Sequence, residues 1–465
     1  MILEYLLSLI SLYLVIVTIG VVHVLLYKRD ARSALGWIGL ILVFPVAGAL
    51  LYLLFGINRV RRKARRISLR VEPEGGWRRA GLLPEGGACL DNVGFAITGL
   101  GLKPGNSVHC YHDGEEAFPA MLDAIQAARR EVLLSSYIFD NDSTGQQFVD
   151  ALASARDRGV DVRVLIDDVG MRYSFPTVAR AFRKAGLEFR RFMPLRLIPP
   201  SLSLNLRTHR KLLITDRTLA FAGGMNIGDR QLARGHSRHR ASDLHFGFEG
   251  PAVGEFVRLF EEDWRFMGGE KLSHRQARTV PAGDAEVRVI SDGPDETLDS
   301  LALLIGGTIG RARQRAWIMT PYFLPDRALT GCLQAAALSG VDVRVMIPET
   351  NNWPVVQWAL QHTMAELLIA GVRILRRPAP FAHSKCIIID EDYALVGSSN
   401  LDPRSLRLNF EVGVEVFDPA LNEHLATHFE ALVPTCSTYT MPTINARSTP
   451  VRLRDAAAAL FSPYL

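Results

Sequence analysis

Two copies of one short pattern carry the side chains in this sequence that are best suited to catalysis. Both follow the spacing His-x-Lys-x4-Asp, and they comprise His209, Lys211 and Asp216 in the first copy and His383, Lys385 and Asp390 in the second. Two imidazoles and two ammonium groups suit phosphodiester exchange. One histidine attacks phosphorus, the other protonates the leaving alkoxide, and the lysines hold the anionic oxygens. The duplication favours a built site over a chance pattern in one hairpin.

The residues around each copy have the alternating pattern of a β-strand. From 208 to 215, the side chains of His209 and Lys211 fall on one face, because residues two apart in a strand point the same way. The same spacing places His383 and Lys385 together, ahead of a buried apolar run at 386–389. Each histidine is therefore expected beside its own lysine.

Each motif ends in an aspartate at a turn, which begins a β-hairpin. An aspartate there bonds nearby backbone groups, so we interpret Asp216 and Asp390 as mainly structural members of the catalytic motif. The first turn is expected to be centred between Asp216 and Arg217, and the second on Glu391. These centres set which residues face the histidines.

Small residues are expected opposite both histidines. The predicted registers place Gly224 opposite His209 and Ser399 opposite His383. Small residues there would let a bulky phosphate approach the backbone. Asn226 and Asn400 follow within two residues as candidate amide donors to that phosphate.

A second stretch of the chain is also duplicated. Residues 159–166 read Gly-Val-Asp-Val-Arg-Val-Leu-Ile and recur at 340–347 with one change, so the chain consists of two related halves. Each half is expected to run helix, strand, helix, strand: the first over 117–130, 132–139, 146–158 and 160–166, the second over 297–313, 316–323, 328–339 and 341–347. This alternation predicts an α/β fold with a mostly parallel, buried sheet.

These motifs and their flanks resemble the phospholipase D superfamily, and in particular bacterial cardiolipin synthases. The stretches that carry the resemblance are Arg207–Lys211, Gly223–Asn226, Asp243–Val253, Pro321–Phe323, Gly397–Ser405, Leu408–Glu411 and Phe461–Leu465. The resemblance covers essentially the whole chain. It implies two phospholipase D-like α/β/α repeats in a pseudo-two-fold arrangement, with one active site at their interface, no metal and no cofactor. It also implies condensation of two phosphatidylglycerol molecules into cardiolipin and glycerol through a phosphatidyl-histidine intermediate.

The resemblance also implies roles for individual residues. His209 and His383 become nucleophile and acid/base, with His209 favoured as the nucleophile, and the implied phosphate ligands are Lys211, Lys385, Asn226 and Asn400. The family places a carboxylate behind each histidine, and the matching residues are Asp243 for His209 and Glu411 for His383. A carboxylate on Nδ1–H would fix the ring tautomer and leave Nε2 to react. For Asp243 the alternative is a salt bridge in a surface loop, since the arginine-rich stretch before it departs from the family pattern.

The amino terminus predicts a membrane anchor. Residues 5–27 and 34–57 are two runs without formal charge if His23 is neutral, and the second would reach roughly 36 Å as a helix, enough for a hydrocarbon core of about 30 Å. We therefore expect a two-helix transmembrane hairpin. A cleaved signal peptide is the alternative, but a second apolar run follows at once and no basic segment precedes the first.

Basic residues predict the orientation of that hairpin. Three lie between the two runs, and six follow the second: Lys28, Arg29 and Arg32, then Arg59, Arg61, Arg62, Lys63, Arg65 and Arg66. The excess favours a multi-pass protein of the cytoplasmic (inner) membrane with its catalytic body on the cytoplasmic side. The same cluster is suited to anionic headgroups, at about 1 kcal/mol per residue near such a surface.

Composition narrows the function classes. The 465 residues carry a net charge of +5, mostly explained by the cluster at 59–66, so a nucleic-acid partner is not required. Five widely spaced cysteines without a CxxC pattern indicate neither a zinc site nor a complete disulfide set, and fit a reducing compartment. We expect a hairpin at 1–58, a basic linker at 59–108, and repeats at 109–285 and 286–465.

Other polar residues have competing interpretations. His236, His239 and His245 suggest metal binding, but the first two lie among arginines and suit a solvated loop better. Asp167 and Asp168 end a strand, where they either line the cleft or cap a turn. Tyr137 and Tyr322 follow matching strands, where substrate contact and core packing are equally expected.

The sequence thus predicts a membrane-bound phosphatidyltransferase that acts on phosphatidylglycerol and other anionic phospholipids. A hydrolase of the same superfamily, a phospholipase or nuclease, remains open, since water versus alcohol as acceptor depends on the shape of the cleft. A non-catalytic lipid-binding scaffold is the third alternative, and two intact motifs argue against it. The sequence does not determine acyl-chain preference or oligomeric state.

Overall fold

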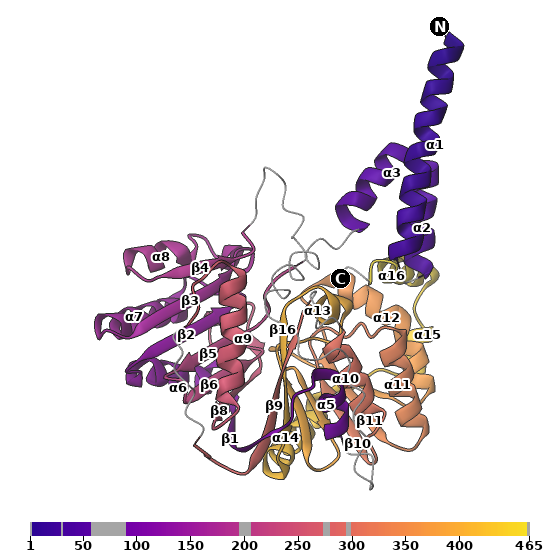
Figure 1. Cartoon of the computed structure of the whole chain (residues 1–465). Coiled ribbons are helices and arrows are strands. Elements are labelled where there is room, and N and C mark those ends of the chain that lie inside the picture. The colour runs from indigo at the N-terminus through magenta and orange to yellow at the C-terminus, as the bar shows by residue number, and fades with distance from the viewer. Residues whose placement is uncertain are drawn as a thin grey trace. The chain divides into compact units, whose positions relative to one another are not determined.

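A computed structural model describes residues 2–28, 31–56, 90–194, 206–272, 280–293 and 299–462 (Figure 1). The chain forms two compact units, which are the N-terminal helical segment and an α/β body that holds every described residue from Leu90 onward. The basic cluster at 59–66, Arg29 and Cys89 lie outside the described residues, as do the last three residues of the chain.

The N-terminal unit contains one helix that is long enough to cross a membrane. The apolar stretch Ile10–Tyr27 of α1 (Ile2–Tyr27) meets the length and composition of a span. The second expected span is not one helix. It folds as α2 (Ala31–Val43), α3 (Pro45–Leu51) and a π turn, Tyr52–Gly56. Pro45 causes the break, because it lacks an N–H and its ring clashes with the carbonyl four residues earlier.

The second apolar run packs back against α1. Val24, Ala34, Ile41 and Tyr52 form a small buried cluster, and the Tyr52 hydroxyl lies 2.9 Å from Nδ1 of His23. Pairing polar side chains with each other is favourable in an apolar environment, where an unpaired polar group costs several kcal/mol. The N-terminal unit is therefore a packed helical structure with a broken second leg.

The α/β body contains two successions of elements in the same order. Repeat 1 comprises β1 (Lys103–His112), α6 (Asp113–Ala127), β2 (Glu131–Ser136), α7 (Ser143–Asp157), β3 (Asp161–Asp167), α8 (Val178–Lys184), β4 (Phe189–Phe192), β5 (Leu212–Thr215), β6 (Leu219–Gly223), β7 (Ala241–Ser242), β8 (Leu244–Glu249) and α9 (Val253–Phe266). Repeat 2 comprises β9 (Ala285–Asp292), α10 (Ser300–Ile309), β10 (Arg315–Met319), α11 (Arg327–Leu338), β11 (Asp342–Pro348), α12 (Pro354–Ile369), β12 (Arg373–Arg377), β13 (Phe381–Ala382), β14 (Cys386–Ile389), β15 (Tyr393–Gly397), α13 (Pro403–Arg407), β16 (Glu411–Phe417) and α14 (Pro419–Leu432). The predicted helix and strand order is confirmed in both halves.

Short elements flank the repeats. A helix, α5 (Asp91–Thr98), precedes β1, and β17 (Ser437–Thr438), α15 (Met441–Asn445) and α16 (Thr449–Ala459) follow α14. Two matching helices begin at matching aspartate caps. Asp142 accepts a hydrogen bond from Gly145 N at the start of α7, and Asp326 accepts one from Leu329 N at the start of α11. The repetition in sequence is thus matched by repetition in local structure.

One large sheet runs through both repeats. Among the described residues it has 15 strands in the order β17-β12-β11-β10-β14-β15-β16-β9-β1-β8-β6-β5-β2-β3-β4. Apart from β17, the order reads equivalently outward from the central β9 and β1 pair, which Figure 1 shows between the two repeats. The centre of the molecule is therefore where equivalent strands of the repeats meet.

The expectation of a mostly parallel sheet is wrong. In this sheet only outer strands pair in parallel, β2 with β3 and β3 with β4, and β10 with β11 and β11 with β12. The pairs between them are antiparallel, including both motif hairpins and the β1–β9 junction. The hairpins account for the difference, because a three-residue turn can join only antiparallel strands. Alternation of strand and helix therefore predicted parallel pairing correctly for the βαβ segments, but not for the strands that carry the motifs.

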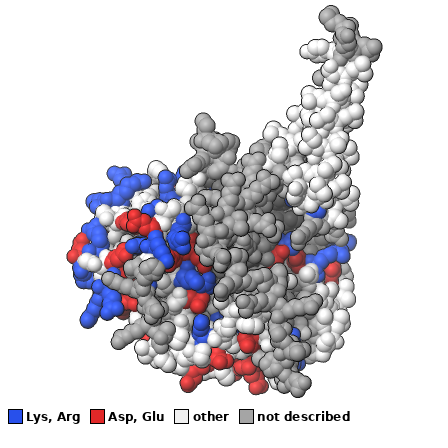
Figure 2. Space-filling view, viewed as in Figure 1, with Lys and Arg blue, Asp and Glu red and all other residues white. Residues whose placement is uncertain are grey.

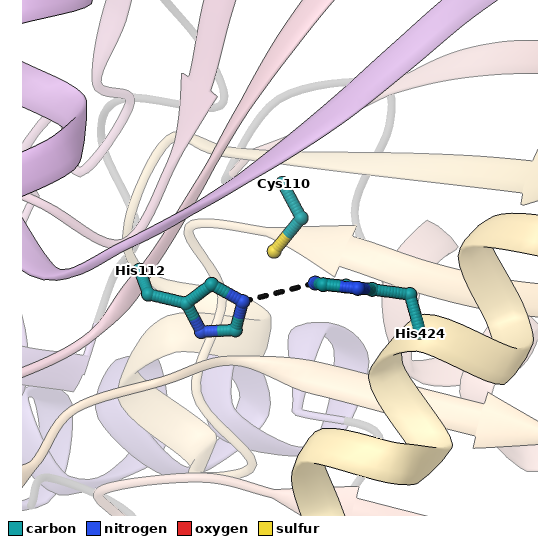
Figure 3. Close-up of side chains that lie close together, drawn as sticks. All are labelled: Cys110, His112 and His424. Carbon is teal, nitrogen blue, oxygen red and sulfur yellow. Dashed lines mark hydrogen bonds between the residues drawn. The ribbon is translucent and has the colours of Figure 1, made fainter.

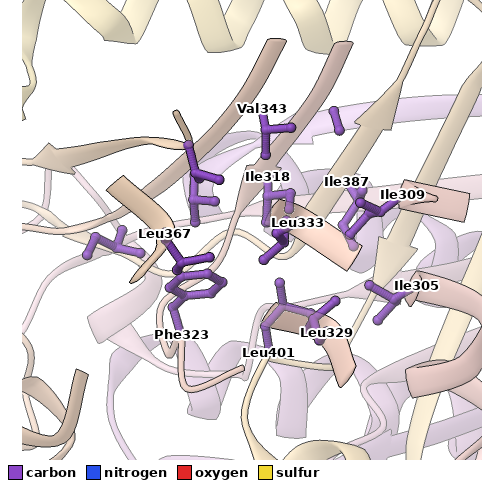
Figure 4. Packing of buried hydrophobic residues seen from close by; sticks show 14 of the residues in the cluster. Ile305, Ile309, Ile318, Phe323, Leu329, Leu333, Val343, Leu367, Ile387 and Leu401 are labelled. Atoms are coloured by element: carbon purple, nitrogen blue, oxygen red, sulfur yellow. The ribbon is translucent and has the colours of Figure 1, made fainter. Parts of the chain in front are cut away.

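Helices cover the sheet and enclose an apolar core in each repeat. In repeat 2, Ile305 and Ile309 of α10 and Leu333 of α11 pack with Ile318 of β10 and Leu367 of α12 (Figure 4). Each side chain of this size contributes about 1.5–3 kcal/mol when fully buried. An equivalent cluster fills repeat 1. The apolar core of each repeat holds in place the strands that meet at the junction.

Candidate active site

Both motif histidines lie at the junction of the two repeats. The backbone N–H of His209 donates to the Phe410 carbonyl of repeat 2 at 2.9 Å, and that of His383 donates to the Ser242 carbonyl of repeat 1 at 2.8 Å. Parallel bridges run beside them, Thr208 with Phe410 and Ala382 with Ser242. Each histidine is therefore anchored by the backbone of the other repeat.

Each histidine meets a carboxylate from the other repeat. Nδ1 of His383 lies 2.7 Å from Oδ2 of Asp243, and Nδ1 of His209 lies 3.1 Å from Oε1 of Glu411. The expected pairing within one repeat, Asp243 with His209 and Glu411 with His383, is therefore wrong. The reason is the crossed backbone pairing at Ser242 and Phe410, which precede the two carboxylates. Asp243 is buried at this contact, which excludes the surface-loop alternative.

The two carboxylates are held differently. Glu411 is fully buried and accepts hydrogen bonds from Ser398 Oγ and from Asn409 Nδ2. Asp243 accepts the backbone N–H of Leu244 at 2.8 Å, and Gly224 leaves it room. A Cβ on Gly224 would lie 2.5 Å from Oδ2 of Asp243. The expected use of Gly224, close approach of a phosphate, is replaced by close approach of a carboxylate.

The lysines lie beside their histidines, as the strand spacing predicts. Lys385 Nζ donates to the His383 carbonyl at 2.5 Å and lies 3.2 Å from Nε2 of that ring. Lys211 Nζ donates to the His209 carbonyl. The Tyr137 ring contacts both first-motif groups, at 4.4 Å from the His209 ring centroid and 5.5 Å from Lys211 Nζ. Histidine and lysine therefore share a face in each copy.

Positive charge is disfavoured throughout this site. Burial lowers the pKa of His209 well below its ordinary value, and the charges of Lys211 and Arg404 lower it further. Burial and Lys385 lower the pKa of His383 to about 4, although Asp243 opposes the shift. Burial also lowers the pKa of Lys385 to about 8. A phosphodiester anion among these groups would favour their protonated forms and relieve the repulsion.

The asparagines lie at equivalent positions, and both are buried. Asn226 accepts a hydrogen bond from Ile138 N at 3.0 Å, and Asn400 donates one from Nδ2 to Ser405 Oγ at 3.1 Å. Within the described part of the chain, Oδ1 of Asn400 has no partner. A phosphate ligand must donate an N–H, and an asparagine amide carries two. Asn400 uses one of its two on Ser405, so the other can serve a phosphate.

The motif aspartates hold backbone, as interpreted from the sequence. Asp216 accepts the amides of Arg130 and Glu131 at 2.7 and 3.0 Å, and Asp390 accepts those of Gln314 and Arg315 at 2.8 and 3.2 Å. Both have positive φ, 51° and 48°. They contact the segments that enter β2 and β10, and they fix each motif hairpin to its neighbouring strand.

One predicted hairpin register is right and the other is shifted. Cys386 pairs with Val396, so the second turn is centred on Glu391 as expected. Leu212 pairs with Ala222, which centres the first turn on Arg217 and not between Asp216 and Arg217. Positive φ at both Asp216 and Arg217 allows a three-residue turn there. Neither ladder extends to the histidines, so the expected pairings at Gly224 and Ser399 do not form.

Arg210, between the first-motif histidine and lysine, extends across the repeat junction. Its buried guanidinium lies 2.6 Å from Oδ1 of Asp263 and donates to Ser291 Oγ and to the Glu411 carbonyl. The sequence analysis did not identify this residue. The signal that could have identified it is a basic residue on the inner face of a strand, because a buried charge must be paired with other polar groups. Arg210 ties the first motif to strands β9 and β16 of repeat 2.

Other residues singled out from the sequence have structural roles. Asp167 accepts the amides of Val169, Gly170 and Thr208, and so it holds both a turn and the approach to His209. Asp168 pairs with Arg172 and Arg191. His245 is buried in β8, whereas His236 and His239 lie in the loop before β7, and no metal cluster forms among these three described residues. Tyr322 lies near His383 through Phe381, and its hydroxyl donates to Asn352.

Comparison with known proteins identifies the family. A family model described as "Cardiolipin synthase, PLD-like domain" matches residues 121–264 and 305–433, which include both motifs. The chain belongs to this family. A second model, "Phospholipase_D-nuclease N-terminal", matches residues 15–56. These two matches cover the α/β body and the N-terminal unit.

Full-length relatives agree with the family assignment. The chain is 30% identical to "Cardiolipin synthase" of Oceanobacillus iheyensis over 97% of both chains, and 30% identical to "Major cardiolipin synthase ClsA" of Bacillus subtilis over 98% of this chain and 99% of that one. The fold is similar to a crystal structure titled phosphatidylserine synthase from Haemophilus influenzae, with a TM-score of 0.61, 16% identity, and coverage of 81% of this chain and 100% of that one.

Proposed function

We propose that this protein is a cardiolipin synthase that joins two phosphatidylglycerol molecules and releases glycerol. The observation that carries the proposal is the crossed pair of half-sites, in which each His-Lys pair is braced by a carboxylate from the other repeat. Two imidazoles arranged in this way can serve one phosphorus atom from opposite sides. Membership of the cardiolipin synthase family selects lipid phosphodiesters among the possible substrates.

In the first half-reaction, Nε2 of His209 attacks phosphorus of phosphatidylglycerol. The bond from phosphorus to the glycerol oxygen breaks, and His383 donates its proton to that oxygen. Lys211, Lys385 and Asn226 hold the non-bridging oxygens, with Asn400 as a further candidate. Glu411 keeps the proton of His209 on Nδ1, so that Nε2 carries the lone pair. The product is a phosphatidyl-histidine.

In the second half-reaction, the neutral His383 accepts the proton of a hydroxyl group on another phosphatidylglycerol. The hydroxyl oxygen then attacks phosphorus, the bond to His209 breaks, and cardiolipin leaves. His383 must carry a proton at the start of the first step and accept one in the second, and the 2.7 Å contact with Asp243 stabilises this imidazolium form. The same pair of histidines therefore serves both steps in a ping-pong scheme.

Exposed aromatic residues favour access from a lipid surface. Phe175 follows β3 and is 96% exposed, and Trp353 follows the equivalent strand β11 and is 56% exposed. Ring contacts lead inward from the first loop, from Tyr173 to Tyr137 and then to His209. Exposed basic residues of α8 accompany Phe175, and Figure 2 shows Lys and Arg side chains gathered over this part of repeat 1. Aromatic and basic side chains together suit the surface of an anionic membrane.

The N-terminal unit supplies the membrane attachment in this proposal. The α1 helix crosses the bilayer, and the broken leg formed by α2 and α3 returns the chain to the same side, with the body facing the cytoplasm. Anionic phospholipids would contact the basic segment at 59–66. Accessibility of a single introduced cysteine in the α/β body, measured in sealed vesicles of each orientation, tests the proposed side.

One assay separates the proposed transferase from a hydrolase. Purified full-length protein in detergent receives labelled phosphatidylglycerol alone, and lipid chromatography identifies the products. Cardiolipin with an equal amount of glycerol is expected. Phosphatidic acid as the main product would mean that water is the acceptor, and the protein would then be a phospholipase D-type hydrolase.

A further inference from the structure

A cluster of metal-ligating side chains lies at the junction of the repeats but outside the proposed active site. Sγ of Cys110, Nε2 of His112 and Nε2 of His424 all lie within 4.8 Å of one another (Figure 3). The two imidazole nitrogens are 2.9 Å apart. A further imidazole is adjacent, since the His428 ring centroid lies 4.5 Å from that of His112, although its nitrogens are not among the ligand atoms that converge. Sulfur and imidazole nitrogen are the ligands that Zn²⁺ prefers.

Secondary structure explains why these four side chains lie close together. Cys110 and His112 are two residues apart at the end of β1 and point to one face of that strand. His424 and His428 are four residues apart on α14 and lie on one face of that helix. Sequence reasoning missed the cluster because the two pairs are more than 300 residues apart and neither contains a CxxC pattern.

We propose that Cys110, His112, His424 and His428 form a binding site for a borderline-soft divalent cation, of which Zn²⁺ is the best match. The strand β1 belongs to repeat 1, and α14 belongs to repeat 2. A bound cation therefore joins the two repeats at a point away from the histidines of the proposed active site. Its role is to stabilise the junction, and it takes no part in phosphatidyl transfer.

The proton balance of binding is simple. The Cys110 thiol loses its proton to solvent when sulfur binds the cation. One of the two facing imidazoles carries hydrogen on Nε2 in the metal-free state, and this proton moves to Nδ1 so that both Nε2 atoms can bind. No redox partner is needed. Glu116, which accepts the backbone N–H of His112 at 2.8 Å, and the nearby Asp113 offset the added charge, whereas Arg377 beside His428 opposes it.

The direct test is titration of Zn²⁺ into purified, chelator-treated, full-length protein in detergent, followed by calorimetry. One equivalent should bind to the wild type. Cys110→Ser and His424→Gln should each weaken binding at least ~100-fold, because loss of a ligand costs at least as much as loss of a supporting residue. Co²⁺ is a second probe, and its thiolate charge-transfer band should be present in the wild type and absent in Cys110→Ser.

Matched controls separate this site from others. His109→Gln changes the same strand on its exposed, opposite face and should leave Zn²⁺ affinity unchanged. His383→Ala removes a proposed active-site histidine and should also leave it unchanged. His424 is exposed, so its substitution should leave the fold intact, which a melting curve without metal verifies.

Stability and activity should respond differently to the cation. A hundredfold excess of Zn²⁺ over its Kd should raise the Tm of the wild type by roughly 5 °C and leave that of His424→Gln unchanged. The initial rate of transfer well below the Tm should be the same with and without EDTA. Equal Zn²⁺ affinity in wild type, Cys110→Ser and His424→Gln would overturn the proposal, and so would loss of binding in His383→Ala.

Discussion

The half-site of His209 and that of His383 share a backbone arrangement and differ in how the carboxylate is held. In the first, Glu411 is fixed by Ser398 and Asn409. In the second, the shorter Asp243 lies against Gly224, the residue equivalent to Ser398, and its hydrogen bond from Leu244 comes from the backbone. Side-chain hydrogen bonds hold Glu411, whereas a backbone hydrogen bond and close packing against Gly224 hold Asp243. Duplicated motifs thus place equivalent atoms while their supports diverge.

The residue between histidine and lysine also differs between the copies. Arg210 in the first copy pairs with Asp263 of its own repeat and bonds to Ser291 across the junction. Ser384 in the second copy is buried without a hydrogen-bond partner for its hydroxyl in the described residues. Among the described residues, only the first copy has a side chain between its histidine and lysine that bonds to the other repeat. The unequal supports fit unequal roles for the two histidines, and substitutions at equivalent positions test that difference.

The largest effect is expected from removal of either histidine. His209→Ala and His383→Ala should each lower the rate of cardiolipin formation by about 10⁴-fold or more, because one removes the nucleophile and the other the general acid and base. Product chromatography measures the rate, and a melting curve controls for folding. Near-normal turnover in His209→Ala would contradict the ping-pong scheme.

Substitutions of Arg210 and Ser384 should differ strongly in stability. Arg210→Ala removes a buried ion pair with Asp263 and the hydrogen bonds to Ser291 and the Glu411 carbonyl of repeat 2, and breaking such a buried pair typically costs about 3–5 kcal/mol. Ser384→Ala removes a hydroxyl without a partner and should change the free energy of unfolding by less than about 1 kcal/mol. Denaturant titration of both variants measures the difference. Equal losses would mean that the buried contacts of Arg210 do not stabilise the fold.

Gly224 and Ser398 occupy equivalent positions, and exchanging them should harm the two half-sites unequally. Gly224→Ser places a Cβ against Asp243 and should displace that carboxylate from His383, with a loss of about 100-fold in kcat. Ser398→Gly removes one hydrogen bond to Glu411, but the hydrogen bond from Asn409 still holds that carboxylate. A loss of roughly tenfold in kcat is therefore expected. A larger loss in Ser398→Gly than in Gly224→Ser would reverse the proposed difference.

The exposed aromatic residues of the two repeats offer a comparison outside the histidines. Phe175→Asp and Trp353→Asp each remove an exposed ring, and the apparent KM for phosphatidylglycerol in vesicles should rise several-fold, more for the more exposed Phe175. The kcat measured in detergent micelles should stay unchanged. An equal fall of kcat in both media would place these residues in the chemical step and not in membrane contact.

The pH dependence should report the lowered pKa values of the unoccupied site. In kcat/KM, protonation of the nucleophile His209 sets the acid limb, which lies at low pH because burial lowers the pKa of that ring. The basic limb follows from loss of the proton that His383 must donate, with a pKa of about 4, and from deprotonation of Lys385 near about 8, which weakens phosphate binding. In kcat both limbs should lie at higher pH, because the bound phosphodiester anion raises the pKa of histidine and lysine. Superimposable profiles would mean that substrate does not change these groups.

The sequence predicted the parts of the fold that depend on local pattern. Alternation and duplication located the strands, the His-Lys pairs and the turn at Glu391. Each of these features depends on residues that are close together in the sequence. The sequence could not predict that Asp243 contacts His383 and that Glu411 contacts His209, because these contacts depend on how the two repeats pack together. The shifted turn at Arg217 and the break at Pro45 depended on single backbone choices that periodicity does not resolve.

The central claim is that both imidazoles act on one phosphorus atom. The most direct test is acid quenching of each histidine variant with phosphatidylglycerol labelled at phosphorus, followed by counting of label bound to protein. The account predicts covalent label that accumulates slowly in His383→Ala, which keeps the nucleophile but lacks the acid of the first step and the base of the second, and none in His209→Ala. Equal labelling of both variants would show two independent sites and contradict the account.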